Sequence, residues 1–500
     1  MTRSNVKPEP FFCSEPSDAA RDRLLLLSTH FPPGQAAGAR RWEKLAHFAA
    51  KRGFALDVVT LDPRDLEARD PTRLDGLPAG VRIFGVPARK HIASRPIDAL
   101  SKLVRRFRRA PRLETALPAQ SAAAPTASSP STVPAPGTVP AALAGEDWPR
   151  REDILRAGYG PSTWRPALNA LLEIADDAAW ADAAAELAGR FFDPRLHRAI
   201  VSCGPPHMIH AAARRLARRV GVPLVVDLRD AWSERERLHA SFASALWFRL
   251  AGLFEARAFE QASLVVMNTP AAAMLMARVY PALASKILSV TNGYDEEEGL
   301  VADFGPAFVI AYAGSIYLDR SPRNLFRATR QVARELELGA NDLRIELMGN
   351  FEVELIRGMA REEGVEDRLV LHPPGNLRDV AKLLSRAPML VNLPQDSDLA
   401  IPSKIFEYIV RPAWVLALAV QASATGQVLA ESRADVVAPE DVAGIARVIR
   451  ARYLAYRAGE RPKPIADDPR LGRAYQAGIL FDAIERCVRR AGQGTGIENP

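Results

Sequence analysis

The chain has 500 residues, of which 48% are hydrophobic and 25% charged, and 66 basic against 59 acidic residues give a formal net charge of +7. The composition is that of an ordinary globular protein, and the length suggests two or three domains. Three widely spaced cysteines argue against a disulfide framework, and no zinc spacing or RNA-binding signature points to a nucleic-acid partner.

The N-terminal segment carries Pro, Glu and Asp where a signal peptide needs an apolar core, so we expect a cytoplasmic protein. No apolar run approaches the roughly 18–20 residues that span a bilayer. We expect residues 1–20 to be disordered. The basic run at 102–112 and an Arg-rich first helix predict attraction to an anionic membrane surface, on the inner face of the membrane.

The first half of the chain alternates short apolar runs with amphipathic segments. A buried parallel strand is expected at 23–28, followed by a glycine-containing loop, a basic helix that ends at Gly53, and a second strand at 55–61. This is a βαβ opening, and 81–87 predicts a third strand. Residues 115–145 are rich in Pro, Ala and Ser and uncharged, which indicates a disordered insertion inside this domain.

The alternation resumes with helices in 150–192, where Trp164 and Trp180 are expected to pack. The strands expected next lie at the start of 197–207, within 222–232, at 263–268 and at the start of 287–295, with helices between them. Residues 21–300 therefore predict one doubly wound α/β domain.

A second parallel sheet is predicted over 301–460. Its expected strands are 308–314, 343–349, 368–374, 388–394 and 413–419, and its expected helices include 321–337, 352–363, 402–410 and about 440–455. The tail, 461–500, carries a last helix near 470–490 that we expect to pack back on the first domain.

Ligands of open α/β sheets bind beyond the carboxyl ends of the strands, so the residues that follow each strand are candidates. In the second half these candidates are Gly314, Ser315, Arg320, Gly349, Asn350, Ser403, Lys404 and Glu407. Glycine loops and cations suit a phosphate, and Glu407, on the same helix face as Lys404, suits a ribose hydroxyl. The plain alternative for 401–409 is a solvent-exposed Lys–Glu pair.

In the first half the candidates are Gly34, Gly38, His207, Arg229 and Asp230. The alternative for His207 is a structural histidine. The alternative for Asp230 is a helix cap or an ion pair with Arg229.

Six stretches together resemble glycosyltransferase family 4 and its relatives, over about 23–104 and 195–455. They are HFPPGQAAGARRWEKLAHFAAKRG, SCGPPHMIH, VVDLRDAW, VTNGYD, AYAGSIY and IPSKIFEYI. The resemblance implies the GT-B fold, with two Rossmann-like domains facing across a cleft. It also implies a nucleotide-sugar donor in the second domain, a glycan or lipid-linked acceptor in the first, and retention of anomeric configuration.

The resemblance implies roles for particular residues. Glu407 matches the glutamate that binds the donor ribose, and Gly314 matches the diphosphate loop, but the family's partner glutamate falls at Leu399, which is apolar. Arg320 and Lys404 would stabilise the leaving diphosphate, and His207 would orient the reacting sugar.

No cofactor is implied, and the reaction is expected to be metal-independent, since the DSD sequence at 396–398 is better interpreted as a loop. The alternatives are a nucleotide-sugar 2-epimerase of the same fold and a degenerate, non-catalytic nucleotide-binding member, which Leu399 would favour. A Rossmann dehydrogenase is disfavoured, because the first loop lacks G-x-G-x-x-G.

Overall fold

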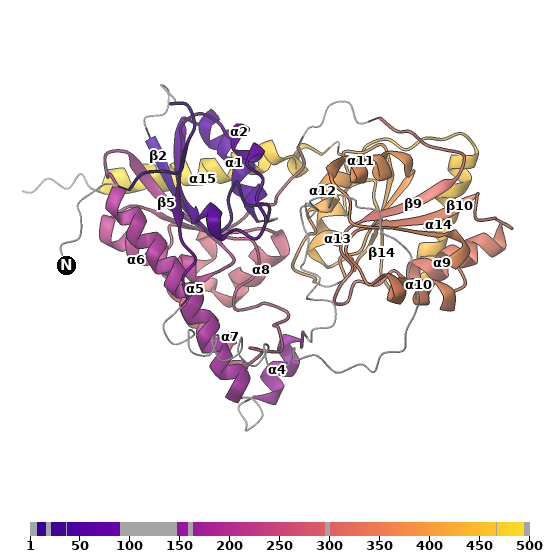
Figure 1. Cartoon of the computed structure of the whole chain (residues 1–500), viewed down its shortest axis with the longest axis horizontal. Helices are drawn as coiled ribbons and strands as arrows, with labels where there is room; N and C mark the ends of the chain where they lie inside the picture. Colours follow the sequence, from indigo (N-terminus) through magenta and orange to yellow (C-terminus); the bar gives the residue numbers. More distant parts are fainter. Residues whose placement is uncertain are drawn as a thin grey trace, which may run out of the picture.

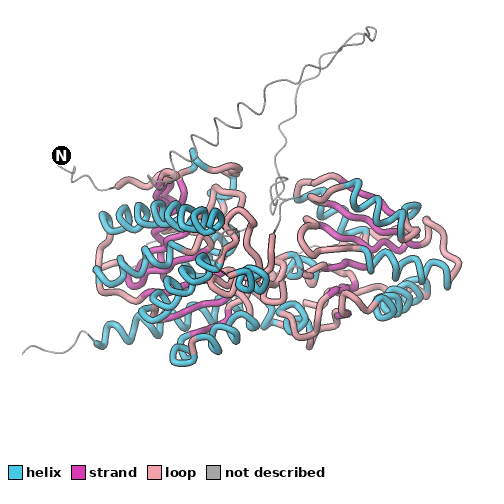
Figure 2. Tube along the Cα trace, turned by 90° about the horizontal axis from the view of Figure 1, so that it is seen from below, coloured by secondary structure: helices cyan, strands magenta, loops and turns pink. Residues whose placement is uncertain are grey.

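The computed structural model describes residues 8–16, 22–36, 38–90, 148–158, 164–295, 301–395, 397–466 and 468–494. Two α/β domains lie side by side, each with a central sheet between layers of helices (Figures 1 and 2). The predicted insertion at 115–145 and the basic run at 102–112 lie outside the described residues.

The first domain is built on an eight-stranded sheet of order β1-β4-β3-β2-β5-β6-β7-β8, parallel except for β1. The strands are β1 (Phe12–Cys13), β2 (Asp22–Ser28), β3 (Phe54–Leu61), β4 (Val81–Val86), β5 (His197–Gly204), β6 (Leu224–Leu228), β7 (Leu264–Met267) and β8 (Ile287–Ser289). The four leucines at 24–27 are fully buried because helices cover both faces of this sheet.

The expectation of a disordered N-terminus is wrong for part of residues 1–20. Phe12–Cys13 pairs antiparallel with β4, and the Phe11 amide donates to the Ile83 carbonyl at 2.9 Å. A two-residue edge strand is too short to show an alternating pattern, so the sequence gives no sign of it.

Helices α5, α6 and α7 cover one face of this sheet, and α1 together with the C-terminal α15 covers the other (Figure 1). The helices of the domain are α1 (Ala39–Lys51), α2 (Thr72–Asp75), α4 (Arg151–Ala157), α5 (Trp164–Phe191), α6 (Met208–Val220), α7 (Ala245–Gln261) and α8 (Pro270–Val279). Trp180 packs in the core as expected, but Trp164, in the first turn of α5, is 57% exposed, so that expectation is wrong.

The second domain has a six-stranded parallel sheet of order β11-β10-β9-β12-β13-β14. Its strands are β9 (Phe308–Ala313), β10 (Leu343–Met348), β11 (Leu369–His372), β12 (Met389–Asn392), β13 (Trp414–Leu418) and β14 (Asp435–Val437). Helices α9 (Arg323–Glu335), α10 (Val353–Glu362) and α14 (Val442–Arg457) cover one face, and α11 (Leu377–Arg386), α12 (Lys404–Tyr408) and α13 (Ala424–Leu429) cover the other. Helix α12 is shorter than the predicted 402–410, and the sequence analysis missed α13 and β14.

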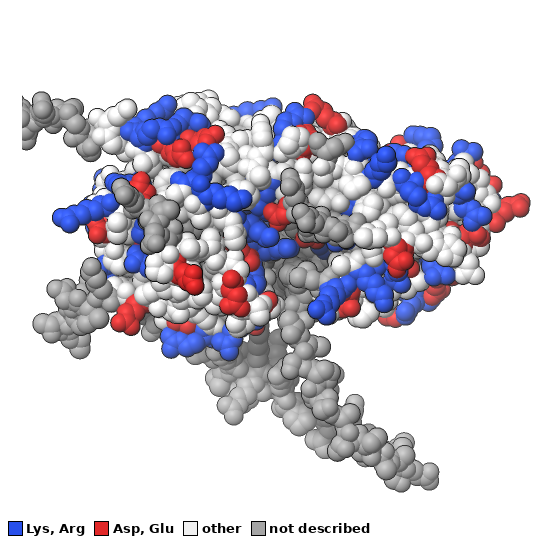
Figure 3. All heavy atoms as spheres, turned by 90° about the horizontal axis from the view of Figure 1, so that it is seen from above, with Lys and Arg blue, Asp and Glu red and all other residues white. Residues whose placement is uncertain are grey.

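The tail returns to the first domain, as predicted. Helix α15 (Arg473–Gly494) lies against α1, and Leu480, Phe481 and Ile484 are fully buried there (Figure 1). Among the described residues, no helix combines the length and apolar character needed to cross a bilayer. Basic and acidic side chains are interspersed over both domains in the view of Figure 3.

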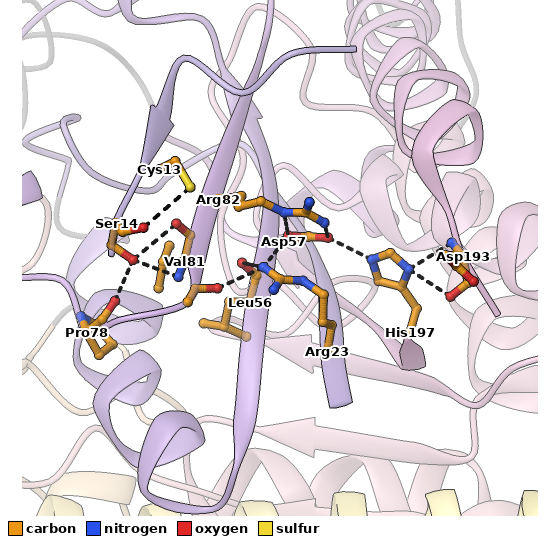
Figure 4. A network of polar contacts seen from close by, with 11 residues as sticks. Cys13, Ser14, Arg23, Leu56, Asp57, Pro78, Val81, Arg82, Asp193 and His197 are labelled. Atoms are coloured by element: carbon orange, nitrogen blue, oxygen red, sulfur yellow. Dashed lines mark hydrogen bonds and ion pairs between the residues drawn. The ribbon is translucent and has the colours of Figure 1, made fainter. Parts of the chain in front are cut away.

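A buried charge network ties together four strands near their amino ends (Figure 4). The fully buried Asp57 carboxylate accepts hydrogen bonds from Arg23 at 2.6 Å, from Arg82 at 2.7 Å and from His197 at 2.9 Å. Burial alone would raise the pKa of Asp57, but these hydrogen bonds outweigh it and hold the pKa well below its usual range.

Candidate functional site

A cleft of about 690 Å³ separates the two domains and is lined from both. Every sequence-predicted site residue except Gly34 and His207 lines it. These residues are Gly38, Arg229, Asp230, Gly314, Ser315, Arg320, Gly349, Asn350, Ser403, Lys404 and Glu407. Their convergence follows from the parallel topology, since the carboxyl ends of the strands in a sheet open on the same edge.

Two glycines shape the second-domain wall. A side chain on Gly314 would overlap the Lys404 ammonium and the Tyr312 hydroxyl, and one on Gly349, whose φ is +149°, would overlap the Gly314 carbonyl. The Gly314 amide also donates to the Met348 carbonyl at 2.7 Å. Glycine is therefore needed at both positions for the two loops to pack together with a lysine beside them.

Lys404 brings an enclosed cation to these loops. Burial and the charge of Arg320, partly offset by Glu407, together lower the pKa of Lys404 to about 8. The Lys404 ammonium lies 5.6 Å from the centre of the Tyr312 ring. An anion bound here would favour the charged lysine, so the site is electrostatically suited to a phosphate.

Arg320 lies on the same loop, with its guanidinium 4.5 Å from the Tyr317 ring centre and 3.5 Å from the Ser315 carbonyl. Tyr408 anchors α12 to β9, because its hydroxyl accepts a hydrogen bond from the Ala313 amide at 2.9 Å. Sequence reasoning missed Tyr408, because its position next to Glu407 was the only sign of its role.

Glu407 does not pair with Lys404 in this structure. Its side chain is 37% exposed and forms an ion pair of 3.0 Å with Arg40, which lies on α1 of the first domain. The solvent-exposed Lys–Glu pair is therefore not observed. Instead, the carboxylate expected to bind a ribose forms one of the contacts between the two domains.

Other contacts cross between the domains near the cleft. Asp319, which follows β9, pairs with Arg237 and, at 2.7 Å, with Arg150. The Thr269 hydroxyl donates to the Leu399 carbonyl at 2.7 Å, and the Asp398 amide donates to Glu236 at 3.2 Å. The segment around Leu399 thus lies against a first-domain carboxylate, Glu236, which lines the cleft.

The first-domain wall is supported by a buried arginine. The Nε and Nη2 atoms of Arg41 each donate a hydrogen bond to the Asp227 carboxylate at 2.9 Å. The Nη1 atom donates to the side-chain oxygen of Asn268, also at 2.9 Å. The Trp42 indole donates to the same carboxylate at 2.8 Å. This network fixes the start of α1 against the ends of β6 and β7.

Asp230 and Arg229 both line the cleft. Arg229 donates to the Gly204 carbonyl at 3.2 Å and to the Pro205 carbonyl, and its guanidinium occupies the space that a side chain on Gly38 would fill. Because Gly38 has no side chain, the Arg229 guanidinium has the space to reach the rim of the cleft.

Two predicted positions lie elsewhere. The Gly34 amide donates to the Phe31 carbonyl at 3.0 Å and Gly34 bridges to Arg69, so it shapes a turn outside the cleft. His207, which precedes α6, is 5% exposed and lines a separate, smaller cavity on the α5–α7 side of the sheet. The expected contact between His207 and a sugar in the cleft is not supported.

Comparisons with known proteins identify the fold. No family model and no curated protein sequence matches the chain. Among solved structures, the N-terminal domain of trehalose-6-phosphate phosphatase from Candida albicans superposes with a TM-score of 0.55 at 10% identity, over 96% of this chain and 100% of that one.

Two further solved structures agree. A UDP-forming α,α-trehalose-phosphate synthase from Burkholderia vietnamiensis gives a TM-score of 0.55 at 11% identity, over 96% and 100% of the two chains. A lipopolysaccharide outer core galactosyltransferase gives 0.50 at 9% identity, over 93% and 99%. The predicted GT-B fold, with two Rossmann-like domains facing across a cleft, is confirmed.

Proposed function

We propose that the protein is a retaining glycosyltransferase, of the family 4 type, that transfers a sugar from a nucleotide-sugar donor to a glycan or lipid-linked acceptor in cell-envelope or exopolysaccharide synthesis. The observation that carries the proposal is the convergence of Lys404 and Arg320 on the Gly314 loop inside an interdomain cleft. The resemblance of the six sequence stretches supports the same activity.

The donor's diphosphate is expected beside the Gly314 loop at the Ser315 amide, with Lys404 and Arg320 balancing its charge. The Gly314 amide, which the sequence also suggested as a hydrogen-bond donor, is already bonded to the Met348 carbonyl. The bond between the sugar's anomeric carbon and the phosphate oxygen breaks while a bond to the acceptor hydroxyl oxygen forms on the same face. The hydroxyl proton passes to the departing phosphate oxygen, so no protein nucleophile is needed. Negative charge grows on the diphosphate in the transition state, where preorganised cations contribute most.

Donor binding has a structural consequence at Glu407. A ribose hydroxyl that hydrogen-bonds to this carboxylate competes with Arg40, the first-domain residue that holds it. Binding of the nucleotide is therefore expected to loosen one contact between the domains.

The nucleotide-sugar 2-epimerase of the same fold is the second candidate. Three carboxylates of the loop after β6, Asp230, Glu234 and Glu236, are among those on the first-domain wall of the cleft, where proton transfer at a sugar carbon would need them. Incubation with the nucleotide sugar alone separates the two functions, because an epimerase forms a new nucleotide sugar without an acceptor.

Calorimetric titration with UDP, GDP, ADP and CMP tests the donor site. One nucleoside diphosphate should bind, and Lys404→Met should weaken it about 10- to 100-fold, as expected for a lost charge-assisted hydrogen bond. Lys463→Met, an exposed lysine outside the cleft, is the matched control. If no nucleotide binds, the degenerate scaffold becomes the better interpretation.

The pH dependence of nucleotide affinity is a second test of the role of Lys404. The bound anion raises the pKa of Lys404 above its value of about 8, so the complex holds more protons than the unliganded protein above that pH. Affinity should therefore fall as pH rises from about 7 to 9 in the wild type. In Lys404→Arg, whose guanidinium stays charged, this fall should disappear.

Attraction to an anionic membrane surface remains a proposal based on the run at 102–112. Helix α1 contributes less than its sequence suggests, because Arg40 and Arg41 are engaged by Glu407 and Asp227. Sedimentation with anionic vesicles at low salt should show binding, and its absence would contradict the proposal.

A further inference from the structure

A second cavity of about 210 Å³ lies in the first domain, between α5, α7 and the loops that follow β5 and β6. We call it the His207 pocket. It is lined by Glu173, Ile174, Asp177, Pro205, Pro206, His207, Met208, Trp232, Arg235, Trp247, Ala251 and Phe254. Arg235 lines both this pocket and the interdomain cleft, so the two cavities are neighbours.

His207 is the polar centre of the pocket. Its ring stacks on Trp232, with centroids 5.2 Å apart and planes 19° apart. Within the described part of the chain, neither ring nitrogen has a hydrogen-bond partner, although the side chain is 95% buried. Burial, reinforced by the charges of His210, Arg235 and Arg229, lowers the pKa of His207, so the imidazole is neutral and needs one acceptor and one donor.

Two carboxyl groups lie one helical turn apart on α5 and face the same space. Burial raises the pKa of Glu173 and of Asp177 to about 7 each. The Trp247 indole donates to Glu173 at 3.0 Å, and the charge of Arg235 offsets only part of the pKa rise at Glu173 and Asp177. Placing these groups beside an unpartnered imidazole costs folding free energy, which a bound ligand would recover.

The chemistry of the lining selects a class of ligand. An ammonium group would suit the carboxylates, but it has no lone pair for the imidazole N–H, and it would meet the Arg235 guanidinium. An anion would be repelled by Glu173 and Asp177. A hydroxyl group both donates and accepts, so a ligand with several hydroxyls satisfies His207 and both carboxyl groups together. The aromatic walls, Trp232, Trp247 and Phe254, suit the apolar face of a sugar ring.

We propose that the His207 pocket is a binding site for a sugar ring, with the sugar's hydroxyls hydrogen-bonded to His207, Glu173 and Asp177. If the protein is a glycosyltransferase, as proposed above, the occupant is a sugar unit of the acceptor. The loop after β6 then links the two sites, because Asp230 lines the cleft, Trp232 lines the pocket and Arg235 lines both.

Saturation-transfer NMR and calorimetry on the full chain test the site directly. The probes are D-glucose, D-galactose, D-mannose and N-acetyl-D-glucosamine, with putrescine as the amine comparison. At least one sugar should bind the wild type, and Asp177→Asn and His207→Phe should each weaken it at least tenfold. Asp182→Asn is the matched control, because Asp182 lies on the same helix, is exposed, and pairs with Arg215 outside the pocket.

His207→Phe keeps an aromatic ring against Trp232 and removes only unpartnered nitrogens, so it should fold. Failure of every sugar to bind, binding of putrescine in their place, or sugar binding unchanged in His207→Phe would each overturn the proposal. Lys404→Met separates it from the proposed function: this variant should lose nucleotide binding and keep sugar binding. Sugar binding by a wild-type protein that binds no nucleotide would leave the pocket standing and remove only its acceptor role.

Discussion

A buried histidine lies near each end of strand β5, and the two rings differ in whether their nitrogens have hydrogen-bond partners within the described residues. His197 begins the strand and is 1% exposed; its Nε2 donates to Asp57 at 2.9 Å, and its Nδ1 accepts from the Asp193 amide at 3.0 Å. His207 lies three residues beyond the strand and is equally enclosed, yet within the described residues neither of its nitrogens has a partner.

The difference follows the direction of the sheet. At the amino ends of the strands, the Asp57 carboxylate receives hydrogen bonds from Arg23, Arg82 and His197 (Figure 4). Beyond the carboxyl end of β5, on the side of the sheet where α/β proteins bind ligands, both ring nitrogens of His207 lack a partner among the described residues. A buried carboxylate whose hydrogen bonds come from the protein indicates a structural role, and an unsatisfied imidazole that lines a cavity indicates a site.

The largest expected effect comes from breaking the satisfied network. Asp57→Ala leaves two arginines and a histidine without their carboxylate, so the free energy of unfolding should fall by about 3–5 kcal/mol. Urea titration measures this. Asp22→Ala is the control, since the exposed Asp22–Arg198 pair on the neighbouring strands should cost less than about 1 kcal/mol. Equal losses in the two variants would show that the network is not structural.

The two regions should also respond to pH in opposite directions. The pKa of Asp57 is lower in the folded protein than in the unfolded chain, so its stabilisation is present above about pH 4 and is lost as pH falls below it. Asp177, whose pKa is raised to about 7, stabilises the fold below about pH 4 and loses that contribution as pH rises through 7.

Urea titrations across this pH range check the signs. The stability of the wild type relative to Asp177→Asn should decline between about pH 4 and 7, by at most about 1.4 kcal/mol per pH unit. Relative to Asp57→Asn, the wild type should lose stability only below about pH 4. If the difference in unfolding free energy between the wild type and Asp177→Asn does not change with pH, the Asp177 carboxylate is solvated. The contrast between the two regions would then weaken.

Much of the fold follows from the sequence for physical reasons. Buried parallel strands are apolar runs, such as 24–27, and the residues after them converge at one edge, which is why Gly314, Arg320 and Lys404 all line the cleft. The sequence also predicts a last helix near 470–490, and α15 lies there against the first domain.

What the sequence could not show depends on packing between distant segments. The Arg40–Glu407 pair joins residues 367 positions apart and needs the orientation of the two domains. Glu173 and Asp177 have the spacing of a solvent-facing helix surface, but α7 and the loops after β5 and β6 pack around them and leave them half-buried. The sequence places His207 after a strand end, but its stacking on Trp232 turns it away from the cleft.

A smaller effect is expected from the satisfied histidine. His197→Phe keeps the stacking on Phe192 but removes the donor to Asp57 and the acceptor of the Asp193 amide. Leaving these buried partners unpaired should lower the free energy of unfolding by about 1–3 kcal/mol in the same urea titration. No loss would indicate that Arg23 and Arg82 alone suffice for the carboxylate.

The smallest effect is expected at the other end of the strand. His207→Phe replaces an imidazole without partners by an apolar ring of similar shape, so the free energy of unfolding should be unchanged or slightly higher in the absence of sugar. A sugar that binds the pocket should raise the melting temperature of the wild type and not that of the variant. A loss as large as that of His197→Phe would mean that His207, too, is a structural histidine. Both rings would then be buried for a structural reason, and the main argument that the His207 pocket binds a ligand would fail.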